Sequence, residues 1–309
     1  MCIRDRSITE WLPIRGAIPP LSDSAWLAEF EKYKQIPEFT AEHPDMDMSG
    51  FKFIYFMEWG HRQLGRIIGL VYGLPFLWLL LRRQLPAGRV SRFVIILLLI
   101  GLQGAIGWWM VYSGLQDDRV SVSQYRLATH LGMAFIILGM LYWNWKDSRE
   151  GWPAKTLKVS FKRRTTVLTV LIYLQIIGGA FVAGTQAGKS YNSWPLMDGS
   201  FFPDGYFIMS PMWRNIFENI PAIQFNHRLL AYIVLGVSLW VFFSTRGRHT
   251  AVHKKTRVLL ALVFVQVFLG IWTLLSAAQI SLSLLHQFTA IFVFLASLAA
   301  MRQATIQRV

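Results

Sequence analysis

The sequence predicts an all-α polytopic membrane protein with seven spanning helices. Composition is the first indication, since 54% of the 309 residues are hydrophobic and only 16% are charged, against about 25% charged residues in ordinary soluble domains. The second is that the apolar residues form seven long runs, and the third is that the basic residues gather in every second loop. Such a chain has too few polar side chains to cover a soluble globule. The same composition excludes intrinsic disorder.

Each of the seven apolar runs is long enough to cross a bilayer, because about 20 helical residues traverse the hydrocarbon core. In chain order the expected spans are Gly60–Leu81, Phe93–Tyr112, Leu127–Trp145, Val167–Thr185, Phe225–Phe243, Val258–Ser276 and Leu282–Met301. The lipid bilayer is therefore the first partner that the sequence predicts.

Basic residues distinguish the two sides of the membrane. Eighteen lysines and arginines follow the first, third, fifth and seventh spans, Arg302 and Arg308 among them. The loops 113–126, 186–224 and 277–281 contain only Arg119, Arg126, Lys189 and Arg214. The positive-inside rule then places the first set and the C-terminus in the cytoplasm, as expected for a bacterial inner membrane. The net charge of +14 is explained by this topology, so no nucleic-acid partner is predicted.

The two halves of the sequence resemble one another. The repeat-related segments are 61–64 with 227–230, 102–108 with 265–272, and 129–130 with 285–286. Parallel repeats in membrane proteins usually form two similar bundles with a site in each. We therefore predict two pseudo-symmetric helical bundles, one from residues 7–145 with an outer segment and one from residues 146–309. The fourth span has no counterpart in the first half, which predicts an eighth helix upstream of Ser7 and a chain truncated at its N-terminus.

The outer segment before the first span carries its own helical pattern. Trp26, Leu27, Phe30 and Tyr33 form an apolar stripe at helical spacing. We expect a short amphipathic helix that lies over the outer mouth of the first bundle.

Four histidines are expected at one depth, in the first turns of helices on the outer side: His61, His130, His227 and His286. Ionisable groups inside membrane spans are rare and usually functional. Each half offers two imidazoles, whereas zinc sites usually take three or four protein ligands. Two neutral imidazoles on opposite sides of one iron suit haem, and facing helices of a bundle can hold such a group between them. We therefore predict these histidines as haem-iron ligands, two in each half.

Charged neighbours of the histidines are the next candidates. Arg62 and Arg228 directly follow His61 and His227, and either could bind a haem propionate or extend to the membrane interface. Glu58 stands three residues before His61, on the same helical face, whereas Gln224 stands three residues before His227. This difference predicts acid–base chemistry in the first half and an electron-carrying haem in the second.

Several motifs together resemble the haem A synthase family. They are the segments Ser7–Pro13, Gly16–Pro20, Phe56–Arg62, Gly178–Gly184, Asn192–Gly199 and Gln224–Arg228. The long outer segment, and outer loops without a cysteine pair, are similar to the type found in many proteobacteria and mitochondria. The resemblance implies eight helices in two four-helix bundles, with the first helix missing from this chain.

The resemblance also implies the chemistry. Members of the family oxidise the C8 methyl of haem o to a formyl group, with a b-type haem as cofactor, in the pathway of cytochrome oxidase assembly. Carried onto this chain, His61 and His130 would hold the substrate haem o, Glu58 would assist catalysis, and His227 and His286 would ligate haem b. The family suggests haem o synthase and terminal oxidase assembly factors as partners, and the sequence does not identify the electron acceptor.

Two alternatives stay open at this point. A di-haem cytochrome b with bis-histidine ligation would transfer electrons without modifying either haem. A haem-handling transporter would use the histidines as transient ligands. The main hypothesis is a membrane oxidoreductase that acts on haem o.

Overall fold

The computed structural model describes residues 15–113, 121–151, 161–247 and 250–306. Within these ranges seven helices are long and apolar enough to cross a membrane. They are α3 (Met48–Leu81), α4 (Val90–Ser113), α5 (Gln124–Glu150), α6 (Lys162–Gly184), α8 (Ile220–Thr245), α9 (Thr250–Leu275) and α10 (Ile280–Ile306). The predicted all-α membrane fold and the number of spans are confirmed. The helices are longer than the apolar runs, because helical hydrogen bonding continues into the polar flanks.

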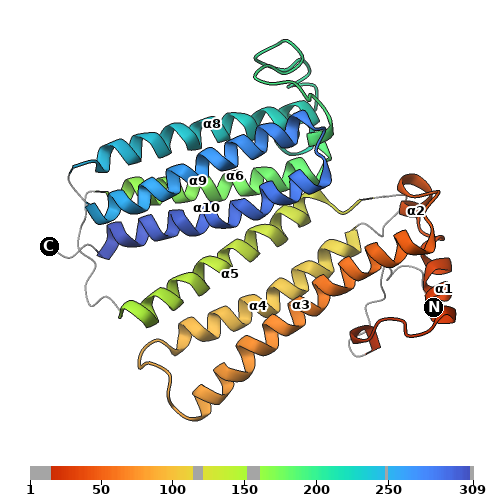
Figure 1. Cartoon of the computed structure of the whole chain (residues 1–309), viewed down its shortest axis with the longest axis horizontal. Helices are drawn as coiled ribbons and strands as arrows, with labels where there is room; N and C mark the ends of the chain where they lie inside the picture. The colour runs from red at the N-terminus through yellow and green to blue at the C-terminus, as the bar shows by residue number, and fades with distance from the viewer. Residues whose placement is uncertain (1–14, 114–120, 152–160, 248–249, 307–309) are drawn as a thin grey trace. The chain divides into compact units, whose positions relative to one another are not determined.

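The chain divides into two compact units, Met1–Met133 and Ala134–Val309, and each is described by itself. In the second unit α6, α8, α9 and α10 form a four-helix bundle (green to blue in Figure 1). Each of these helices contacts two neighbours in the cyclic order α6, α8, α9, α10, so α8 and α10 lie diagonally opposite. The bundle core contains fully buried aliphatic side chains from three helices, among them Leu168, Val241 and Leu259.

The part of α5 that belongs to the second unit packs against α10. The rings of Phe135 and Phe294 have centroids 5.3 Å apart, and Gly139 allows Phe294 and Leu298 to approach the α5 backbone closely. Small residues permit such close helix contacts in membrane proteins. These contacts fix the position of α5 along α10.

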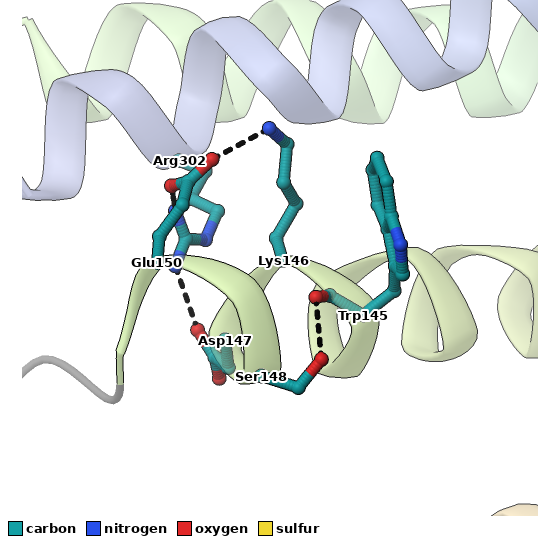
Figure 2. Close-up of polar contacts among 6 residues, drawn as sticks. All are labelled: Trp145, Lys146, Asp147, Ser148, Glu150 and Arg302. Carbon is teal, nitrogen blue, oxygen red and sulfur yellow. Dashed lines mark hydrogen bonds and ion pairs between the residues drawn. The ribbon is translucent and has the colours of Figure 1, made fainter.

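A buried charge cluster joins the C-terminal ends of the same two helices (Figure 2). The Arg302 guanidinium donates to the Asp147 carboxylate at 2.9 Å and also pairs with Glu150. The side chains of Arg302 and Asp147 are only 5% and 2% exposed. We predicted Arg302 as part of a cytoplasmic flank, and the structure places it within α10, where it holds α5.

The first unit contains an aromatic cluster outside the expected membrane span. Helix α1 (Asp23–Tyr33) and α2 (Pro37–Glu42) pack on the N-terminal part of α3. The buried members of the cluster are Trp26, Phe30, Tyr33, Ile36, Phe51 and Tyr55. The predicted amphipathic helix is confirmed as α1, but Leu27 is 54% exposed and does not belong to the buried face.

Helix α3 begins at Met48, twelve residues before the expected start of the span at Gly60. Asp47 caps it, because its carboxylate accepts the Gly50 N–H at 2.8 Å. This bond, with another from Ser49, holds the pKa of Asp47 below its usual value. Phe51 and Tyr55 then pack under α1, so tertiary contacts extend the helix well beyond its apolar run.

Arg302→Met should reduce the free energy of unfolding by about 3–5 kcal/mol, because the buried Asp147 carboxylate would lose its ion pair with Arg302. Denaturant unfolding in detergent micelles, followed by circular dichroism, measures this change. The control is Lys146→Ala, which removes a partly exposed ion pair with Glu150 and should cost no more than about 1 kcal/mol. Equal effects of the two variants would contradict the role given to the buried pair.

Candidate haem-binding sites

The four predicted ligand histidines lie on four different helices: His61 on α3, His130 on α5, His227 on α8 and His286 on α10. His130, His227 and His286 stand within the first eight residues of their helices, as expected. His61 is the exception, since it lies four turns from the start of the extended α3. The expectation of a first-turn position is therefore wrong for His61.

The structure brings His61 and His130 together in the first unit. Their ring centroids are 6.3 Å apart, with the ring planes inclined by 42°. A metal-to-imidazole bond is about 2 Å long, so two rings that face one metal ion from opposite sides have centroids about 6 Å apart. The separation of this pair therefore fits a single iron between the two rings.

His227 and His286 are the corresponding histidines of the second unit. They come from α8 and α10, which are diagonal in the four-helix bundle, and they stand at the eighth and the seventh residue of these helices. Ligands from facing helices are a common way to hold a cofactor in a bundle core. In the described part of the chain no group of three or more His, Cys, Asp or Glu side chains forms a metal site.

Three of the histidines pack against a glycine on the neighbouring helix. A methyl group built on Gly107 or on Gly270 would come within 2.9 Å of Cε1 of His130 or His286, respectively. His227 lies against Gly178 and Gly179 in the same manner, with contacts of 3.3 and 3.4 Å. An added methyl group would force the imidazole to shift at Gly107 and Gly270, whereas at Gly178 and Gly179 a shift of a few tenths of an ångström would make room.

A glutamine stands four residues before the glycine in each case. Its side-chain amide nitrogen donates to the backbone carbonyl of the histidine and lies 3.2–3.4 Å from both ring nitrogens. The pairs are Gln103 with His130 (3.1 Å to the carbonyl), Gln175 with His227 (3.0 Å) and Gln266 with His286 (2.9 Å). The histidine side chains are thus held by a repeated Gln-x-x-x-Gly segment on α4, α6 and α9.

The role of these glutamines was not predicted from the sequence. Gln103 and Gln266 lie in repeat-related segments, and Gly178 and Gly179 belong to a family motif, but neither pattern indicates a contact with histidine. One signal in the sequence indicates this role. The Gln-x-x-x-Gly spacing occurs three times, each time on a helix next to one that carries a histidine.

Glu58 and Gln224 have different surroundings in the two units. The Glu58 carboxylate forms an ion pair with Arg62 on the next turn of α3. Gln224 is buried, and its amide donates to the carbonyls of Ala187 and Ser190 at 2.9 and 2.5 Å. A carboxylate has no hydrogen to donate, so glutamate could not replace Gln224 in these bonds without a bound proton.

Arg228 holds the loop between α6 and α8 against α8. Its guanidinium donates to the carbonyls of Tyr191 and Ser193 at 2.6 and 2.9 Å and to the Gln224 side-chain oxygen at 3.1 Å. It also lines a pocket with the apolar side chains Pro195, Met197, Phe201, Phe225, Leu229 and Tyr232. A role of Arg62 or Arg228 in binding a propionate stays a prediction.

The loop between α6 and α8 is organised by the amide side chains of two asparagines. Asn192 donates to the carbonyl of Leu274 at the end of α9 (2.9 Å), and Asn219 donates to the carbonyls of Gly205 and Tyr206. The motif Asn192–Gly199 therefore connects the loop to the bundle. The motif Ser7–Pro13 lies outside the described residues.

Comparison with known proteins shows the family of the chain. The model of the COX15-CtaA family, described as cytochrome oxidase assembly protein, matches residues 6–298. The chain belongs to this family. No solved structure matches it at a significant level.

Curated relatives cover most of the chain and are named Heme A synthase. The protein of Maricaulis maris is 48% identical over 95% of this chain and 86% of its own length. Those of Ruegeria sp. and Paracoccus denitrificans are 45% and 42% identical, over 95% and 96% of this chain and 79% and 80% of their own lengths.

Gly107→Ala should destabilise the first unit, because the new methyl group would overlap the His130 ring and overpacking usually costs about 1–3 kcal/mol. Thermal unfolding in detergent measures the effect. Gly104→Ala is the matched control one turn earlier on α4, where an added methyl group meets nothing within 4 Å. If the two variants unfold at the same temperature, the glycine does not serve to accommodate the histidine.

Proposed function

We propose that this chain is a membrane oxidoreductase that converts haem o to haem A by oxidising the C8 methyl to a formyl group. The observation that carries the proposal is the two histidine pairs, with a carboxylate beside only one of them, in a chain whose relatives are named Heme A synthase. The product is needed for the cytochrome oxidase assembly that the family description names. Haem o synthase and oxidase assembly factors are the partners proposed on each side of this reaction.

The first unit is the proposed substrate site. The separation of His61 and His130 fits one iron, so these side chains would hold haem o by its metal and fix the porphyrin relative to α3. Conversion of a methyl to a formyl group removes hydrogen from carbon and adds one oxygen atom, so the reaction needs an electron acceptor, an oxygen source and a group that takes up protons. The Glu58 carboxylate, one turn from His61 and paired with Arg62, is the proposed proton acceptor.

The second unit is the proposed haem b site. His227 and His286 come from the diagonal helices α8 and α10 of a bundle whose core contains buried aliphatic side chains. Gln224, in place of a carboxylate, holds the loop. Two imidazoles with neutral, apolar surroundings suit a low-spin haem that carries electrons. When bound there, haem b would supply one-electron chemistry. Arg228 would be available to bind a propionate of this haem.

The location of the sites follows from the charge distribution. Arg302, Lys146 and Arg149 stand at one end of the helices, and the histidines stand toward the other end. With the positive-inside rule, both haem sites are proposed on the outer side of a bacterial inner membrane and the C-terminus in the cytoplasm.

Glu58→Gln should abolish haem A formation, with a loss of about 100-fold or more, as is usual when a general base is removed. Haem is extracted from membranes that contain haem o and the expressed protein, and haem A is quantified by pyridine haemochrome spectra and chromatography. Haem b content should stay at the wild-type level. Glu31→Gln, which alters an exposed ion pair with Lys34, is the control, and undiminished haem A in Glu58→Gln would refute the proposed role.

A bis-histidine di-haem cytochrome b is the second candidate, favoured by the similar Gln and Gly contacts of histidines in both units. That function requires two unmodified haems and no formyl product. The same extraction separates the two candidates, because only the synthase yields haem A.

A further inference from the structure

The loop between α6 and α8 exposes many large apolar side chains. Its segment 194–216 carries only three charged residues: Asp198, Asp204 and Arg214. Five apolar side chains of this segment are between 55% and 73% exposed: Phe201, Phe207, Ile208, Met212 and Trp213. Exposed apolar patches of this kind mark contact with another protein or with a membrane. The segment is therefore a candidate interaction surface.

Two polar side chains of the same loop are turned inward. Asn215 is 1% exposed, and its amide accepts the Met209 N–H and donates to the Met209 carbonyl, both at 3.0 Å. Asn219 is 2% exposed and donates to the carbonyls of Gly205 and Tyr206 at 2.7 and 3.0 Å. Asparagine is mostly exposed in proteins that water surrounds, so this loop shows the reverse distribution, with amides inside and large apolar side chains outside.

The loop lies beside α8. It extends sideways from the N-terminal part of that helix, at the end of the bundle that carries the histidines (Figure 1). The Trp194 indole N–H donates to the Tyr232 hydroxyl at 3.1 Å, and the rings of Phe202 and Phe225 have centroids 5.1 Å apart. Both partners belong to α8, which begins at Ile220. The loop therefore covers the side of the helix over its first turns.

The contacts with α8 define the depth of the loop. The 26 residues of α8 extend over about 39 Å, whereas the hydrocarbon core of a bilayer is about 30 Å thick. A centred α8 places Tyr232, about 18 Å along the helix, inside the hydrocarbon core and Phe225 near its border. A segment that binds both residues from the side reaches the depth of the lipid headgroups and of the first acyl carbons.

The exposed surface of the loop is continuous with the lipid-facing surface of α8. Ile233 and Trp240 are exposed on this span, and Tyr232, next to Ile233, is the exposed residue that binds Trp194. Aromatic side chains are enriched at membrane interfaces. At this depth lipid is the neighbour that every membrane protein has, so lipid is the occupant that the loop fits.

We infer that the segment 194–216 is a membrane-interface loop, whose exposed apolar side chains insert among lipids beside α8. The buried asparagines bind backbone groups of the loop, which is required where little water is present. Arg228 holds the residues just before and within this segment, so lipid contact would also stabilise the end of the bundle that carries the histidines. Insertion into lipid does not depend on the haem chemistry of the bundle.

Fluorescence quenching in lipid nanodiscs that hold one protein copy each tests this contact. Cys2 is the only cysteine of the chain, so Ile208→Cys and Met212→Cys are made in a Cys2→Ser background and labelled with a nitrobenzoxadiazole dye. The quenchers are lipids with a nitroxide high on the acyl chain, and iodide in the water. Ile233→Cys, exposed on the α8 span, is the lipid-facing control, and Arg246→Cys, exposed just after α8, is the water-facing control.

The nitroxide lipid should quench the labels at Ile208 and Met212 about as strongly as the label at Ile233. Iodide should quench them several-fold less than the label at Arg246, and their emission should be blue-shifted. Nitroxide quenching at either position supports the inference. Iodide quenching at the Arg246 level at both positions would refute lipid contact and leave the patch to a protein partner. Protection of both labels from both quenchers would also refute it. Thermal unfolding at the wild-type temperature shows that each labelled variant is folded.

Discussion

The structure depends on the close approach of a histidine ring to the backbone of a neighbouring helix. An imidazole in an apolar bundle needs both space and polar partners, and one segment supplies both: the glycine gives the space and the glutamine four residues earlier binds the histidine carbonyl. Because both residues lie on one face of a helix, the contact also sets the rotation of that helix about its axis. Three such contacts position α4, α6 and α9 relative to the histidine helices.

Polar groups elsewhere are arranged by the same constraint. Without water in the hydrocarbon region, each polar group needs a partner within the protein. At the end of the bundle that carries the histidines, Gln224 and Arg228 bind carbonyls of the segment between α6 and α8. At the other end, Arg302 and Asp147 neutralise one another between α10 and α5. These contacts hold both ends of the second bundle. They thereby fix the positions of α8 and α10, the helices that carry His227 and His286.

Hydropathy alone predicts the seven spans, because a bilayer imposes a length and a composition on each helix. It does not predict that α3 starts at Met48, since that extension depends on Phe51 and Tyr55 packing under α1. Histidine pairing within each half was predictable from the repeat, and for His61 and His130 the ring separation supports it. The glutamine contacts were not predictable from the sequence, because Gln175 and His227 are 52 positions apart. Only the folded bundle brings them together.

The central claim is that the two histidine pairs hold two different haems. Haem analysis of His286→Ala and His130→Ala, purified from cells that make both haem b and haem o, tests it most directly. We expect His286→Ala to lose haem b, and His130→Ala to keep haem b with its low-spin spectrum while losing bound haem o. Loss of the same haem from both variants would contradict the division of the chain into a substrate site and a cofactor site.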